Sequence, residues 1–150
     1  MDWKRIIIAI DNSPVSVNAV KYVASIAGNL SGVNICLLHI YPVPPPDYYR
    51  QGDTLQHYRQ RQEEAAASYL AEATDKLQQA GVPAEAIDSR CLMAEDTTIS
   101  QAILRLQQEE RYGTIVVGKR GISKSEEFLF GSISSALIHH AKDTAVWVVG

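Results

Sequence analysis

Four residues in the second half of the chain have the types and spacing that bind an anion. Gly118 and Gly121 follow a short apolar run. Nine residues separate Gly121 from Gly131-Ser132, which come directly before a helical pattern. Glycines let the backbone approach a ligand closely, and the amides at a helix N-terminus favour a phosphate. The spacing fits a polyphosphate site. It fits equally well a turn, a hinge and a helix cap that hold no ligand.

Two better-known phosphate motifs do not fit this chain. Residues 113–119 match the letters GxxxxGK, but Arg120 follows where a P-loop has Ser or Thr. The four intervening residues, 114–117, are all β-branched, which indicates a strand rather than a loop. The first apolar run is followed by Asp11-Asn12-Ser13 instead of GxGxxG, which argues against a dinucleotide fingerprint.

The apolar pattern predicts the scaffold that must position these residues. Short runs are nearly continuous rather than alternating, which is typical of strands buried on both faces of a parallel sheet. They cover 5–10, 33–40, 86–93, 115–118 and 145–149. Helical patterns separate them, so the element order is βαβαβαβαβ. This order predicts one α/β domain over residues 1–150, with right-handed crossovers.

Four helices are expected between the strands. Ser13 as N-cap and Pro14 at the first helical position begin the first helix. Either Asp96 or Thr97 caps the third. The expected bounds are 57–80 for the second helix, 97–110 for the third and a start at 132 for the fourth. Inward faces are marked by Val17, Val20, Val23, Ala24 and Ala27, by Ala66, Leu70, Ala73, Leu77 and Ala80, by Ile99, Ala102, Ile103 and Leu106, and by Ile133, Ala136, Leu137 and His140.

Two long irregular segments lie on the same side of the predicted sheet. Residues 41–54 follow the second strand, and residues 119–130 follow the fourth. Both therefore leave the carboxyl edge of the sheet, where ligands of open α/β folds bind. Loops of this length in a compact domain are usually functional.

Composition excludes several classes of protein. The 150 residues are 46% hydrophobic and 21% charged, which excludes a disordered chain, a collagen-like repeat and a disulfide scaffold. The formal net charge of −3 does not suggest a nucleic-acid partner. The apolar run at 6–10 is too short for a signal peptide or a membrane span. We therefore expect a cytoplasmic protein with no membrane partner.

Several other reactive side chains have an ordinary structural explanation. Cys36 and Cys91 are far apart, form no CxxC pair and are expected to be buried free thiols. His39 is expected to be a core histidine. His139 and His140 are adjacent on a helix and point in different directions, which disfavours a shared metal. Four tyrosines lie around the proline-rich segment, and two roles fit them. Their rings stack on a nucleotide base or on a protein partner, or they cover an edge of the apolar core: Tyr41, Tyr48, Tyr49 and Tyr58.

The order and spacing of these segments resemble the universal stress protein family over essentially the whole chain. The pattern G-x2-G-x9-G-S at Gly118, Gly121, Gly131 and Ser132 is similar to the ATP-binding signature of that family. Residues 7–13 resemble its opening strand and acidic turn, and residues 37–43 its second strand. Residues 137–149 resemble its closing helix and strand. The resemblance implies an open five-stranded parallel sheet of order 3-2-1-4-5, with helices on both faces.

The resemblance also assigns a nucleotide-binding site. Asp11 matches the acidic residue that contacts the nucleoside, and Ile40 an apolar position that contacts adenine. The remaining positions shape the nucleoside end or line the ribose and the phosphates: Ala9, Ile10, Val117, Gly118, Arg120, Gly121, Gly131, Ser132 and Ile133. The implied ligand is ATP, with ADP and AMP as the alternatives. The resemblance does not decide whether Mg²⁺ or Mn²⁺ accompanies the phosphates. Members of the family usually form homodimers.

The expected activity is that of a nucleotide-responsive switch or scaffold in the stress response, acting on an unknown protein partner. No Ser-His-Asp arrangement or acidic metal cage is recognisable, so at most slow ATP hydrolysis is expected. The last strand lies at a sheet edge and carries no charge over 144–149, which predicts a homodimer through that strand. The alternatives are a dimeric interaction module that needs no nucleotide, and a slow ATPase.

Overall fold

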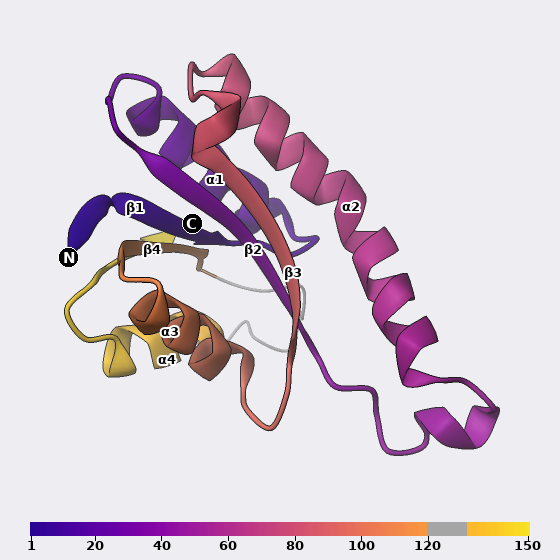
Figure 1. Cartoon of the computed structure of the whole chain (residues 1–150). Coiled ribbons are helices and arrows are strands. Elements are labelled where there is room, and N and C mark those ends of the chain that lie inside the picture. Colours follow the sequence, from indigo (N-terminus) through magenta and orange to yellow (C-terminus); the bar gives the residue numbers. More distant parts are fainter. Residues whose placement is uncertain (120–131) are drawn as a thin grey trace.

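The computed structural model describes residues 1–119 and 132–150 of the chain. The chain alternates strands and helices in the predicted order (Figure 1). The strands are β1 (Asp2–Ala9), β2 (Asn34–Pro42), β3 (Ile87–Ala94), β4 (Tyr112–Gly118) and β5 (Ala145–Val149). The helices are α1 (Pro14–Ala27), α2 (Leu55–Gln79), α3 (Ile99–Glu109) and α4 (Ser132–His140), with short 3₁₀ turns η1 (Tyr48–Gln51) and η2 (Ala84–Ala86).

The five strands form one parallel sheet in the order β3-β2-β1-β4-β5, which confirms the expected topology. The central strand β1 pairs with β2 on one side and with β4 on the other, so that Ile7 lies between Cys36 and Ile115. The Ile6–Ile8 stretch is buried, because both faces of this strand are covered by helices.

Two apolar cores lie on opposite faces of the sheet. One face is covered by α1 and α2, with residues such as Val23 and Leu77 packed against Ile8. The other face is covered by α3 and α4, with Ile103 and Leu137 packed against the strands. The helices change face between β1 and β4, and this places a topological switch point at the centre of the sheet.

The start of α1 agrees with the sequence, whereas α2 begins two residues earlier than expected, at Leu55, and α3 begins two residues later, at Ile99. Ser13 caps α1, and its hydroxyl accepts a bond from the Ser16 amide. At α3 the cap is Thr98, not Asp96 or Thr97, because Thr98 forms a capping box with Gln101. Asp96 instead takes a positive φ of 51° in the preceding turn.

Two residues expected on inward helix faces are exposed. Ala80 follows the last residue of α2 and packs by its carbonyl against the Gly28 backbone, and His140 is the last residue of α4. Both residues stand at the C-terminal end of their helix and do not reach the core.

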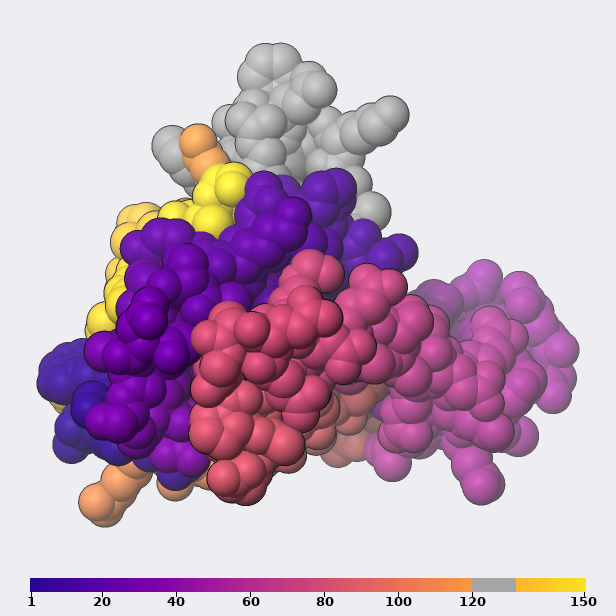
Figure 2. Space-filling model, turned by 90° about the horizontal axis from the view of Figure 1, so that it is seen from above, coloured from indigo at the N-terminus to yellow at the C-terminus, as the bar shows by residue number. Residues whose placement is uncertain are grey.

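Tyr58 is buried at 6% exposure, and its hydroxyl donates to the Pro42 carbonyl at 2.5 Å. This bond ties the start of α2 to the end of β2, although η1 and the first turns of α2 extend beyond the sheet as a lobe (Figures 1 and 2).

Candidate functional site

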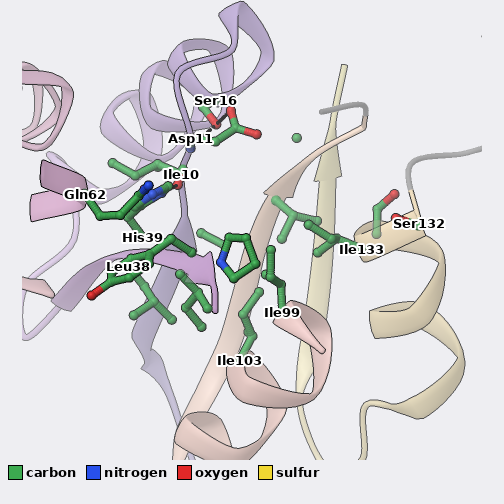
Figure 3. Close-up of a pocket in the computed structure, with 17 residues that line it drawn as sticks. Ile10, Asp11, Ser16, Leu38, His39, Gln62, Ile99, Ile103, Ser132 and Ile133 are labelled. Atoms are coloured by element: carbon green, nitrogen blue, oxygen red, sulfur yellow. Dashed lines mark hydrogen bonds between the residues drawn. The ribbon is translucent and has the colours of Figure 1, made fainter. Parts of the chain in front are cut away.

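A pocket of about 290 Å³ opens at the carboxyl ends of β1, β2 and β4 (Figure 3). It lies at the switch point of the sheet, where open α/β proteins bind ligands. Eight of the residues proposed from the sequence line it: Ala9, Ile10, Asp11, Ile40, Val117, Gly118, Ser132 and Ile133. The other three proposed site residues, Arg120, Gly121 and Gly131, lie outside the described residues.

Asp11 is held in place by the first turn of α1. Its carboxylate oxygen Oδ1 accepts bonds from the Ser13 amide and the Ser16 hydroxyl, each at 2.8 Å. The Ser16 hydroxyl also accepts a bond from the Asp11 amide at 2.8 Å. Both of these groups, the Ser13 amide and the Ser16 hydroxyl, donate to Oδ1. The second carboxylate oxygen, Oδ2, makes no hydrogen bond within the described part of the chain. It is therefore free to accept a bond from a ligand hydroxyl.

The walls of the pocket are largely apolar. Ile99 and Ile103 from α3 line the cavity together with Ile40 of β2 and Val117 of β4. Large apolar walls with few polar groups are usual in ligand sites. Asp11 is the only carboxylate among the described residues that line this space.

Gly118 ends β4 where the pocket meets α1. A Cβ atom at this position would lie 2.9 Å from Cγ1 of Val15 and 3.0 Å from its Cβ. The close approach of β4 to the start of α1 therefore requires a glycine here. This packing reason is independent of any ligand, and it explains the residue without a phosphate.

The N-terminus of α4 faces the pocket from the side opposite to α2. Ser132, the first residue of the helix, is exposed and lines the pocket. The Ser134 hydroxyl donates to the Lys119 carbonyl at 3.4 Å, and the Lys119 amide donates to Val149 at 2.7 Å. The end of β4 is thus joined to both α4 and β5. A helix N-terminus in this position favours an anionic group in the pocket.

Polar and aromatic side chains close the other end of the pocket. His39 lies on β2, and its Nδ1 donates to the Ile10 carbonyl at 2.9 Å. Its ring stacks on Tyr41 with centroids 6.3 Å apart and meets the edge of Tyr69 at 5.4 Å. Burial raises the pKa of Tyr69 to about 12 and also raises the pKa of Tyr41. Both phenols therefore stay neutral at physiological pH.

His39 matches the sequence expectation only in part. It is a hydrogen-bonded histidine, as predicted, but it also lines the pocket. Reasoning from the sequence missed nine lining residues: Ser16, Leu38, His39, Tyr41, Pro42, Gln62, Ile99, Ile103 and Ser134. For Ser16 a signal was available, since a hydroxyl in the first turn of a helix can bond back to the residue before its cap. For Gln62 there was none, because it comes from a helix remote in sequence.

Both cysteines are free thiols, as the sequence indicated, but only Cys36 is buried as expected, and Cys91 is partly exposed. Cys36 is fully buried, and burial raises the pKa of its thiol to about 11. Burial also raises the pKa of the half-buried Cys91. The described residues contain no group of three His, Cys, Asp or Glu side chains able to hold a metal. Nδ1 of His139 bonds to the Ser135 carbonyl in its own helix at 2.8 Å.

The fold defines an α/β protein of the doubly wound kind, with a pocket at its switch point. The chain belongs to the universal stress protein family, whose sequence profile matches residues 2–150. No curated protein sequence matches it significantly. None of the described helices has the length and apolar character needed to cross a membrane.

Solved structures have the same fold at low sequence identity. The universal stress protein UspA from Lactobacillus plantarum has a TM-score of 0.81 at 15% identity, over 100% of this chain and 99% of that one. A universal stress protein in complex with cAMP has a TM-score of 0.69 at 21% identity, over 99% and 98%. The universal stress protein from Archaeoglobus fulgidus in complex with dAMP has a TM-score of 0.64 at 18% identity, over 100% of both chains.

Proposed function

We propose that this chain is an ATP-binding universal stress protein that acts as a nucleotide-responsive switch or scaffold in the stress response. The observation that carries the proposal is the pocket at the switch point, which has apolar walls, an oriented carboxylate and a helix N-terminus. Two structures with the same fold are described as complexes with cAMP and dAMP, which supports an adenine nucleotide as the ligand.

Each part of the pocket suits one part of the nucleotide. The adenine packs between the apolar walls at Ile40, and Oδ2 of Asp11 accepts a bond from the ribose. Ala9, Ile10, Val117 and Gly118 surround the nucleoside. The phosphates lie at Ser132 and Ile133, with Arg120, Gly121 and Gly131 of the family signature. Mg²⁺ or Mn²⁺ accompanies the phosphates if a metal is needed at all, and ADP or AMP are the competing ligands.

The protein acts as a homodimer in the cytoplasm, with β5 as the pairing strand. β5 is an edge strand with uncharged side chains, and Val148 on it is 39% exposed. An apolar edge of this kind invites pairing with a second copy. Val148→Lys places a charge on the edge and is expected to give monomers in sedimentation velocity. Ala71→Lys, at an exposed position of α2, serves as the control for added charge.

Calorimetric titration of nucleotide-free protein with ATP and Mg²⁺ tests the proposal. The expected result is saturable binding of about one ATP per chain, abolished in Gly131→Val and retained in Ser135→Val on the same stretch of chain. An absence of binding in the wild type would overturn the proposal and leave the dimeric interaction module. Phosphate release above the level of Gly131→Val would instead identify a slow ATPase.

A further inference from the structure

Two polar side chains line the pocket at the end away from α4. Gln62 comes from α2 and His39 from β2, while Ser132 lies on the opposite side of the cavity (Figure 3). The Gln62 carboxamide makes no hydrogen bond with any part of the chain that the structure describes. An amide offers one acceptor and two donor hydrogens. These groups stand at the end of an otherwise apolar space, where a ligand can use them.

The position of Gln62 follows from the packing of α2. Gln62 is four residues after Tyr58 and four before Ala66, so all three lie on one face of the helix. Tyr58 and Ala66 are both buried. The Tyr58 hydroxyl bonds to the Pro42 carbonyl at 2.5 Å, which holds this part of the helix against the end of β2. Gln62 is therefore presented to the pocket by a helix that is fixed on both sides of it.

The orientation of the His39 ring is also fixed. Its Nδ1 faces the Ile10 carbonyl, which can only accept, so Nδ1 carries the hydrogen. Two tyrosine rings pack on the imidazole and keep it from turning. In the neutral ring the second nitrogen, Nε2, is then an acceptor, and it makes no hydrogen bond within the described residues. The same end of the pocket thus holds an adaptable amide and a fixed acceptor.

We propose that Gln62 and His39 bind the base at this end of the pocket, and that His39 makes the site prefer adenine to the 6-oxo purines. The inference rests on the proposed function, because it concerns the base of the nucleotide bound there. The adenine amino group N6 donates one hydrogen to the Gln62 carbonyl and the other to Nε2 of His39. The Gln62 amide group donates to the ring nitrogen beside N6, which completes a paired contact of the kind that glutamine makes with adenine.

His39 carries the preference for adenine, whereas Gln62 adds affinity for either base. Hypoxanthine and guanine carry an oxygen in place of N6, and that oxygen only accepts. The Gln62 amide can turn over and donate to it, so glutamine alone does not exclude these bases. Nε2 of His39 cannot turn, and its lone pair would face the oxygen. A buried acceptor left without a donor weakens binding of the wrong base.

The ratio of the dissociation constants for ITP and ATP tests this inference. ITP has the hypoxanthine base and otherwise the same ribose and phosphates as ATP. We expect the wild type to prefer ATP. His39→Phe, which keeps an aromatic ring between the two tyrosines but removes the acceptor, is expected to reduce the ratio about tenfold. Gln62→Leu is expected to weaken both nucleotides and to leave the ratio nearly unchanged, because the amide can pair with either base. Gln60→Leu is the matched control, since Gln60 is exposed and bonds to Glu64 at 3.2 Å.

The outcomes separate this inference from the proposed function. A lining residue that only supported the fold would weaken ATP and ITP equally, and the ratio would not change. An unchanged ratio in His39→Phe, with ATP still bound by the wild type, would overturn the assignment of His39 and leave the nucleotide site intact. A wild type that binds neither nucleotide would overturn the proposed function itself.

Discussion

The Ser16→Ala substitution tests whether the first turn of α1 holds Asp11 in its binding position. The Ser16 hydroxyl donates to Oδ1 of the Asp11 carboxylate and accepts from the Asp11 amide, and each of these hydrogen bonds is 2.8 Å long. Ser16 is 5% exposed, so water cannot easily replace the lost group. Alanine removes both bonds and leaves only a small space.

The expected loss of stability follows from these two bonds. A hydrogen bond to a charged group contributes about 1.5–3 kcal/mol, and a buried donor left unpaired costs about 1–3 kcal/mol. Asp11 is half-buried, so the low end of each range applies and the free energy of unfolding falls by about 2.5 kcal/mol. For a chain of this length, the melting temperature then falls by roughly 5–10 °C.

Urea unfolding followed by tryptophan fluorescence measures this loss, and ATP titration at a temperature where the variant is folded measures the effect on the site. We expect weaker ATP binding, because the carboxylate loses the bond that orients it. Ser25→Ala on the same helix is the control. Its hydroxyl donates to the Tyr22 carbonyl at 2.7 Å on the exposed face, so the change should stay within about 0.5 kcal/mol. Equal stability and equal ATP affinity in the two variants would refute the reasoning.

Three further predictions concern residues away from the pocket. Gly113→Ala should cost about 1–3 kcal/mol in urea unfolding, because its Cβ would collide with the backbone of β1, whereas Gly150→Ala meets no atom within 4 Å and should be neutral. The Tyr48 hydroxyl bonds to Asp53 at 2.6 Å and, as the largest cause, lowers the pKa of that carboxyl from 3.8 to about 2. The contribution of this bond to stability is therefore present above about pH 4 and lost as the pH falls toward 2. Tyr48→Phe should raise the pKa of Asp53 in a carbon-13 NMR titration, and an unchanged pKa would contradict this assignment. Iodoacetamide at pH 8 should not label Cys36 until urea unfolds the protein, since its thiol is buried with a pKa of about 11. Labelling of native protein at this cysteine, measured by mass spectrometry, would show that the core opens.

The existence and order of the strands and helices, and the start of α1, were predictable because their signals are local. Pro14 after Ser13 marks the start of α1 by backbone geometry alone. The cap of α3 was predicted wrongly although the sequence carried a signal for it. Thr98 and Gln101 have the spacing of a capping box, and the residues three positions after Asp96 and Thr97 are not Glu or Gln.

The candidate site was predictable where it depends on the strands. Parallel strands end at one edge of their sheet, so Ala9, Ile40 and Val117 had to come together once the strands were known. Ile99 and Ile103 were identified as inward residues of a helix, but the sequence did not show that the pocket would include them. Their place depends on how α3 packs over the sheet, which no single segment determines.

By itself, the sequence determined which segments become strands and helices, and the order in which they follow. Hydrophobic spacing and capping residues act over a few neighbours, and the handedness of each crossover follows from the twist of the chain. Only the tertiary structure decided that Gln62 of α2 lines the same cavity as His39 of β2 and Ser16 of α1. That choice depends on close packing between elements far apart in the sequence, where a shift of one helix by a single turn would present different side chains to the pocket.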